Sequence, residues 1–176
     1  MNVRAPLPAV LLAAVIAMAA ACAPAPEPPT PAQAAAPVAT PAPPAAPMGE
    51  GTFPLLVVHK SPSCGCCGLW VEHMQQAGFQ VEVRDTNALN PVKERLGVPD
   101  GKGSCHTAEV AGYVIEGHVP AEDVKRLLAQ RPDAKGLVLP GMPLGSPGME
   151  TPDGRTEPYT VELIADDGTT SAYAQH

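Results

Sequence analysis

The stretch Ser61-Pro-Ser-Cys-Gly-Cys-Cys-Gly-Leu-Trp70 places three thiols within four residues, between a predicted strand and a predicted helix. A short β-rich run, residues 55–59, precedes it, and residues 69–77 follow it with the apolar spacing of a helix. Backbone N–H groups at a helix N-terminus stabilise thiolate, the form of cysteine that attacks disulfides and binds metals. The turn is therefore a candidate site for redox or metal chemistry, with a structural disulfide as the plain alternative.

Strand and helix patterns alternate through the first half of the domain. They predict, in order, a buried strand over residues 55–59, a helix over 66–77, a strand over 79–84 and a short helix over 90–96. Asn90 is the predicted N-cap of the short helix, Pro91 its first helical residue and Gly97 the residue after its end. A strand, a cysteine-led helix, a strand and a helix form the opening of a thioredoxin-like α/β domain.

A hairpin pattern over residues 105–118 and an amphipathic helix pattern over 120–129 continue this order. In thioredoxin-like proteins the loop before such a hairpin packs directly against the CxxC turn. That resemblance implies that Cys105 lies beside the other three cysteines. Thioredoxins usually carry a cis-proline in this loop, whereas this chain has Ser104-Cys105-His106. The difference favours a fourth sulfur ligand over plain disulfide exchange.

The last third of the chain predicts a C-terminal extension made of a loop and a hairpin. Residues 136–139 form a short apolar run that predicts a strand, and residues 140–149 form a loop rich in proline and glycine. The alternating patterns of residues 159–164 and 170–173 predict the two strands of the hairpin. Loops of this rigid, bent kind often cover or complete a site, so we expect the 140–149 loop to lie over the cysteine turn.

The N-terminal residues differ in composition from the rest. Residues 1–21 have a basic residue near the start, an apolar run and small residues at the end, which predicts an export signal. The small residues directly before Cys22 also resemble a lipoprotein signal, in which Cys22 would carry a lipid anchor. Residues 22–50, rich in alanine and proline, predict an extended tether, and residues 51–176 are enough for one compact domain. We therefore expect an exported, periplasmic domain, with membrane attachment if Cys22 is lipidated.

Charge and cysteine spacing restrict the class of function. The chain has 11 Lys and Arg against 18 Asp and Glu, with a formal net charge of −7 and no basic cluster, which disfavours nucleic-acid binding. An exported protein can form disulfides, but disulfide-stapled domains usually spread their cysteines along the chain. Here three of the five cysteines lie within four residues. This clustering favours a functional site over a disulfide framework.

Three separated motifs resemble DUF411, a family of bacterial metal-binding proteins that includes a copper-resistance protein. The motifs are SPSCGCCGLW, GSCHTAEVAGYVIEGHVPAEDVKRLL and GMPLGSPGME, and they span about residues 55–150. The resemblance implies a thioredoxin-like fold, an envelope location and copper binding through the clustered cysteines. Composition and periodicity by themselves do not indicate copper.

The donor atoms are consistent with Cu(I). Thiolates and thioethers are soft ligands that select Cu(I) over hard cations, and the motifs offer Cys64, Cys66, Cys67 and Cys105. Zinc is the competing metal, because four cysteines can form a tetrahedral site. Cys66 and Cys67 are adjacent, however, which makes it difficult for both to join Cys64 on one ion. Adjacent thiols suit bridging between several Cu(I) ions better.

Histidines and methionines in the motifs are further candidate ligands. His106 follows Cys105 and His118 follows a predicted strand, so either could reach the sulfurs, although neighbouring side chains on a strand point to opposite faces. Met142 and Met149 lie in the loop and are candidate ligands, a cover for the site or core residues. His59 is as suited to packing as to a site role. His73 lies about 10 Å beyond Cys66 along the predicted helix and is expected to pack or face solvent.

The sequence is interpreted as that of an envelope copper-handling protein that binds Cu(I), coupled or not to thiol redox chemistry. Its partners would be copper ions and other envelope copper-handling proteins. A thiol–disulfide oxidoreductase is the first alternative, with Cys64 as the attacking sulfur and Cys67 as its partner. A zinc site or a purely structural cysteine site is the second.

Overall fold

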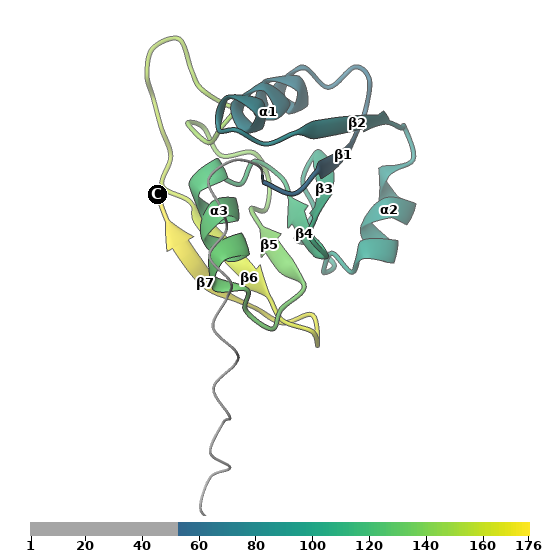
Figure 1. Ribbon diagram of the computed structural model, residues 1–176. Helices are drawn as coiled ribbons and strands as arrows, with labels where there is room; N and C mark the ends of the chain where they lie inside the picture. The colour runs from purple at the N-terminus through teal and green to yellow at the C-terminus, as the bar shows by residue number, and fades with distance from the viewer. Residues whose placement is uncertain (1–52) are drawn as a thin grey trace, which may run out of the picture. The chain divides into compact units, whose positions relative to one another are not determined.

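A computed structural model describes residues 53–176 of the chain (Figure 1). The signal, the tether and Cys22 lie outside the described residues. None of the described helices has the length and apolar character needed to cross a membrane. The elements follow in the order β1 (Leu56–Lys60), α1 (Gly65–Gln76), β2 (Val81–Asp85), α2 (Leu89–Leu96), β3 (His106–Val110), β4 (Tyr113–Glu116), α3 (Ala121–Gln130), β5 (Gly136–Val138), β6 (Thr160–Ile164) and β7 (Thr170–Gln175).

The strands form one seven-stranded mixed sheet in the order β2-β1-β3-β4-β5-β6-β7. β1 runs parallel to β2 and antiparallel to β3, β3 and β4 form a hairpin, and β4 runs parallel to β5. The β6–β7 hairpin extends the sheet beyond β5, at the lower left of Figure 1. The α/β class is confirmed, and the predicted elements all occur within a few residues of their expected bounds.

The start of α2 differs from the sequence prediction. The helix begins at Leu89 with Ala88 as its N-cap, and no side chain caps it. Thr86 Oγ1 accepts a hydrogen bond from the Ala88 N–H at 3.0 Å, which bends the chain into the helix before Asn90 is reached. The predictions of Asn90 as N-cap and of Pro91 as the first helical residue were therefore wrong. Gly97 ends the helix in the left-handed region, with φ 75°, as predicted.

Both faces of the sheet are covered by other segments. Val114 and Ile115 are neighbours in β4, so their side chains point to opposite faces. Ile115 belongs to the larger core, which includes residues of α1 and α3. Val114 belongs to a smaller cluster that packs against Leu96 and Val98, at and just after the end of α2. Helices α1 and α3 therefore cover one face, and the C-terminal end of α2 covers the other.

Helix α1 is fixed by its buried face. Trp70 and Met74 have no solvent exposure, and Trp70 Nε1 donates to Val119 O at 2.9 Å. His73 Nε2 accepts from the Ala121 N–H at 3.1 Å, at the first residue of α3. His73 thus packs between the two helices, as expected. These contacts, made from the middle of α1, hold its cysteine-bearing N-terminus in place.

One close approach in the sheet demands glycine. A Cβ atom at Gly136 would lie 1.8 Å from Val114 O in the neighbouring strand, and Gly136 has φ 153°. We predict that Gly136→Ala lowers the free energy of unfolding by about 3 kcal/mol, the upper range for overpacking. Gly112→Ala is the matched control, because Gly112 also has positive φ but open space around its Cβ, so only about 1 kcal/mol should be lost there. Urea denaturation measures both, and equal losses would contradict the steric argument.

Candidate metal centre

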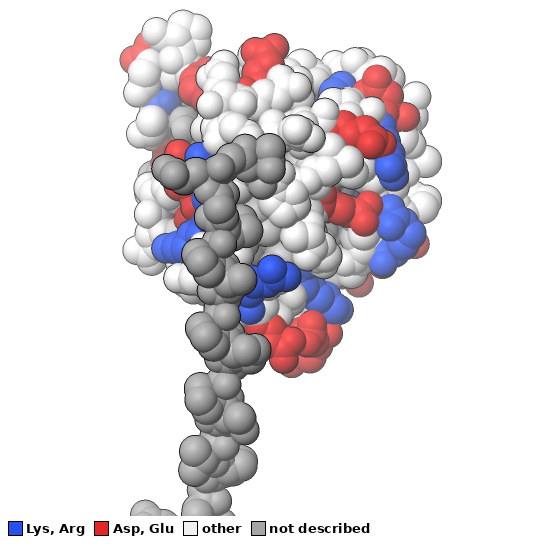
Figure 2. Space-filling view, viewed as in Figure 1, with Lys and Arg blue, Asp and Glu red and all other residues white. Residues whose placement is uncertain are grey.

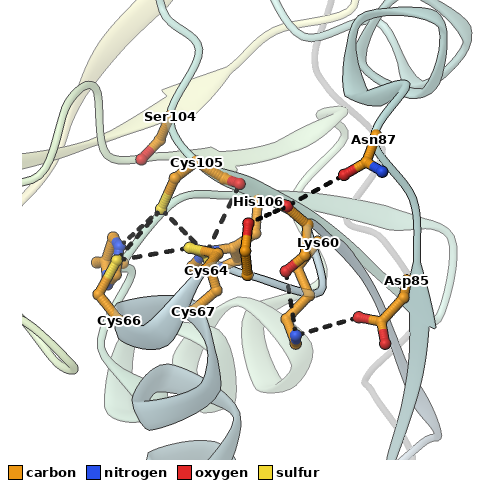
Figure 3. The surroundings of a disulfide bond; sticks show 12 residues. Lys60, Cys64, Cys66, Cys67, Asp85, Asn87, Ser104, Cys105 and His106 are labelled. Atoms are coloured by element: carbon orange, nitrogen blue, oxygen red, sulfur yellow. Dashed lines mark hydrogen bonds and ion pairs between the residues drawn. A yellow bond between two sulfur atoms is a disulfide. The ribbon is translucent and has the colours of Figure 1, made fainter.

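Four cysteine sulfurs meet at the N-terminus of α1 (Figure 3). Cys64 is the N-cap residue, and Cys66 and Cys67 lie in the first turn. Cys66 Sγ is 3.6 Å from Cys64 Sγ and 4.0 Å from Cys105 Sγ, and Cys67 Sγ is 3.3 Å from Cys105 Sγ. All four sulfurs lie within 4.8 Å of one another. A group of this size and composition is able to hold soft metal ions.

Sheet pairing brings the fourth cysteine to the other three. The antiparallel pairing of β1 with β3 places Lys60, the last residue of β1, opposite His106, the first residue of β3. The CxCC turn follows β1, and Cys105 directly precedes β3. Cys105 therefore lies beside the turn, as the thioredoxin-like resemblance implied.

The cluster contains one disulfide and two free thiols. Cys64 and Cys67 are joined, whereas Cys66 and Cys105 are free. Cys67 is fully buried, and the other three are partly exposed. The pKa of Cys105 is raised to about 11 by burial and by the neighbouring Cys66 thiol. In the metal-free protein Cys105 is therefore a neutral thiol at pH 7, and a nearby cation would favour its ionised form.

His118 is oriented toward the cluster. Its Nδ1 is 2.7 Å from Pro147 O, and a carbonyl oxygen can only accept, so Nδ1 carries the proton and donates. In the neutral ring Nε2 is then unprotonated, so its lone pair is directed toward Cys105 Sγ, 3.0 Å away. Burial lowers the pKa of His118, which favours this neutral state. The arrangement is typical of metal-ligating histidines, whose second nitrogen is held by a backbone carbonyl.

His106 also lies at the cluster, on the core face of β3. It has no solvent exposure, and its Nδ1 is 3.6 Å from Cys105 Sγ. Burial and the neighbouring His118 lower its pKa well below the usual value. Within the described residues, its Nε2 is the one buried side-chain nitrogen or oxygen without a hydrogen-bond partner. Cys105, His106 and His118 form a second group of possible ligands, so Cys105 Sγ is shared between the two groups.

The 140–149 loop lies against the cysteine turn, as predicted. A Cβ atom at Gly148 would be 2.6 Å from Cys66 O and 2.8 Å from the Trp70 N, so the loop backbone touches the first turns of α1. At its other end, Ser104 Oγ donates to Gly141 O at 2.5 Å, next to Cys105. The methionines of the loop are less enclosed: Met142 is 48% exposed and Met149 is partly buried.

His59 does not join the cluster. Its Nε2 is 3.1 Å from Glu109 Oε1. In β1 it pairs with Thr107, whose hydroxyl contacts Lys93 and Glu116 rather than the sulfurs. This face of the sheet is the one that α2 covers. The contacts therefore favour a structural role for His59.

The donor set suits a soft cation. The cluster offers sulfur and imidazole nitrogen, and residues 61–71 and 136–149 contain no Asp, Glu, Lys or Arg. Elsewhere, acidic and basic side chains are interspersed over the face seen in Figure 2. Hard cations such as Mg²⁺ and Ca²⁺ require oxygen ligands, which this group lacks. The sulfur and imidazole donors therefore fit Cu(I) or zinc.

Comparison with known proteins agrees with the site. Residues 102–149 match the family described as "Protein of unknown function, DUF411". Two solved structures, titled copper resistance protein CopG, Form 1 and Form 2, are each 42% identical to this chain, with a TM-score of 0.67. Each alignment covers 70% of this chain and 98% of the other. The chain belongs to the DUF411 family. No curated protein matches it.

The sequence of this DUF411 chain did not reveal the residues that orient its candidate ligand His118. Pro147 acts through its carbonyl oxygen and Gly148 through the absence of a side chain, so neither has a donor side chain to identify it. The succession Gly-Ser-Pro-Gly in the loop was the available signal, because it indicates a backbone fixed in an unusual path.

The contact between Pro147 O and His118 can be tested in metal-free protein. In the wild-type protein, long-range ¹H–¹⁵N spectra should show His118 protonated at Nδ1. Gly148→Ala should weaken that state, because the added Cβ would push Pro147 O away from the ring. Gly141→Ala is the matched control, with similar positive φ and nothing within 4 Å of its Cβ. If both variants leave the His118 spectrum unchanged, the loop does not set the tautomer.

Proposed function

We propose that this chain is an exported copper-handling protein whose cysteine cluster binds Cu(I). The observation that carries the proposal is the meeting of four cysteine sulfurs, with Cys105 Sγ shared with two histidines. The 42% identical relatives titled as copper resistance proteins support copper over other soft metals. The donor set contains no carboxylate, so it does not support binding of hard cations such as Mg²⁺ or Ca²⁺.

The proposed ligands are Cys64, Cys66, Cys67 and Cys105. A thiolate can bridge two Cu(I) ions, and Cys105 belongs to both ligand groups, which supports binding of more than one ion. His118 Nε2 and His106 are proposed as additional nitrogen ligands on the Cys105 side. Four thiolates around one ion would carry excess negative charge in a partly buried site, and further cations would neutralise it.

Copper binding through all four sulfurs requires reduction of the Cys64–Cys67 disulfide. A dithiol reductant would supply two electrons and two protons, leaving two cysteine thiols here and a disulfide in the donor. The metal then displaces protons from the thiols as it binds. This is the basis on which we propose coupling between copper and thiol redox chemistry.

The same disulfide favours a second function, thiol–disulfide exchange. Cys64 is partly exposed at the start of α1, whereas Cys67 is fully buried, so an incoming thiolate would reach the Cys64 sulfur first. The strand order β2-β1-β3-β4, with a CxxC at the first helix, supports a thioredoxin-like assignment. In this alternative only Cys64 and Cys67 carry the chemistry.

Export and partners are part of the proposal. The predicted signal over residues 1–21 supports a periplasmic location, and Cys22 is the proposed lipid attachment point. Other envelope copper-handling proteins would deliver or receive the metal. Metal analysis of protein purified from copper-supplemented cells under reducing conditions separates copper from zinc.

Cys105→Ser separates copper binding from disulfide exchange. The variant, fully reduced, should bind fewer Cu(I) ions and lose more than about tenfold in affinity, because a soft ligand shared by both groups is replaced by a hydroxyl. Competition with a colorimetric Cu(I) chelator measures both quantities. Full copper loading in this variant, together with disulfide reductase activity that requires Cys64, would favour the exchange function instead.

The loop methionines are tested by changing Met142 and Met149 to Leu together. The fold should persist, since the swap roughly conserves volume. If the thioethers hold Cu(I) weakly at the edge of the site and pass it on, the double variant should retain copper less well or transfer it to a chelator more slowly. Met74→Leu, within the core, is the control and should leave transfer unchanged. Unchanged stoichiometry, affinity and transfer rate in the double variant would assign both methionines to packing.

A further inference from the structure

A fully buried carboxylate lies beneath the cysteine cluster on the opposite face of the sheet. Glu116, the last residue of β4, has no solvent exposure. Its charge is paired with Lys93 of α2, whose Nζ also donates to Thr107 Oγ1 at 2.9 Å. Burying an ion pair is expensive, and apolar side chains of similar volume often stabilise a fold as well or better. A stabilising role alone therefore does not account for this pair.

The remaining hydrogen bonds of Glu116 go to both sides of Cys105. Its Oε1 accepts from the Ser104 N–H at 2.5 Å, one residue before the cysteine. Its Oε2 accepts from Thr107 Oγ1 at 2.6 Å, two residues after it. The carboxylate thus holds the chain on either side of the residue that contacts Cys66, Cys67 and the histidines.

These two hydrogen bonds restrict the position of the Cys105 sulfur. Cys105 precedes the first residue of β3, so the ladder with β1 holds only the residues that follow it. The segment before it is a loop, and the Ser104 N–H has Glu116 as its hydrogen-bond acceptor. We propose that Glu116, charge-balanced by Lys93, is a positioning residue that holds Cys105 Sγ within reach of the other sulfurs and His118. The consequence for copper rests on the proposed function, whereas the position of the thiol does not.

Two double variants isolate the hydrogen bonds from the charges. Lys93→Met with Glu116→Gln removes both charges but keeps an amide oxygen that can accept from the Ser104 N–H. Lys93→Met with Glu116→Leu removes the charges and the acceptor. Glu109→Gln is the control. Like Glu116, Glu109 is a strand carboxylate that forms an ion pair with α2, here with Arg95, but it does not contact residue 104 or 107.

The primary readout is alkylation of Cys105 in fully reduced, metal-free protein, followed by mass spectrometry of each cysteine. Cys66 in the same molecule serves as the internal reference. Relative to Cys66, alkylation of Cys105 should accelerate about tenfold in the Leu double variant, because that variant loses the hydrogen bonds from both the Ser104 N–H and Thr107 Oγ1. It should stay within about twofold of wild type in the Gln double variant and in Glu109→Gln. Equal rates in the Leu and Gln double variants would overturn the proposal.

Thr107→Val keeps the test decisive if the Leu double variant does not fold. It removes the hydrogen bond from Thr107 Oγ1 to Glu116, together with the one that Lys93 donates to Thr107, with little change of shape and no change of charge. About a threefold faster alkylation of Cys105 is expected from the loss of that bond. An unchanged rate in this variant would count against the positioning role.

Copper affinity, measured on the same variants, separates this proposal from the proposed function. Faster Cys105 alkylation with weaker Cu(I) binding supports both. Faster alkylation with unchanged Cu(I) binding supports the positioning role and removes Cys105 from the copper ligands. Unchanged alkylation overturns the positioning role whatever the copper affinity.

Discussion

The antiparallel pairing of β1 with β3 is the interaction on which the site depends. It joins two strands whose paired residues lie about fifty positions apart in sequence, and it places the end of one strand opposite the start of the other. The turn after β1 and the residue before β3 are thereby brought to the same end of the sheet. The buried face of α1 and the carboxylate of Glu116 refine this meeting from the two sides of the sheet, one fixing the CxCC turn and the other the residue that faces it.

The electrostatics of the cluster follow from its burial. Burial raises the pKa of Cys105 and lowers the pKa values of His106 and His118, so it favours the neutral form of each of these three groups. A cation bound to these sulfur and nitrogen atoms would instead favour the deprotonated thiol and the neutral imidazoles. In the proposed function, metal binding and the Cys64–Cys67 disulfide compete for the same two sulfurs.

The sequence was sufficient for the order of the elements and for the gathering of the cysteines. Periodicity located the strands and helices, and the thioredoxin-like order correctly implied the place of Cys105. Local capping was less predictable. Asn90 has the chemistry of an N-cap, but the helix is capped at Ala88, two residues earlier, where Thr86 Oγ1 accepts from the Ala88 N–H. The support around the site escaped prediction because Glu116, Pro147 and Gly148 act through tertiary contacts. Their partners are distant in sequence, and no spacing rule connects them.

The hydrogen bond that orients His118 is made by the main chain of the loop, through the carbonyl oxygen of residue 147. Any amino acid supplies that oxygen, so the contact itself does not restrict which residue evolution places there. Residue 148 is different, because even one methyl group would collide with the backbone of α1. Substitutions among relatives should consequently be tolerated at position 147 and excluded at position 148. A glycine kept at position 148 would then reflect the space that the loop needs beside α1 to reach the histidine, and not any chemistry of the glycine itself.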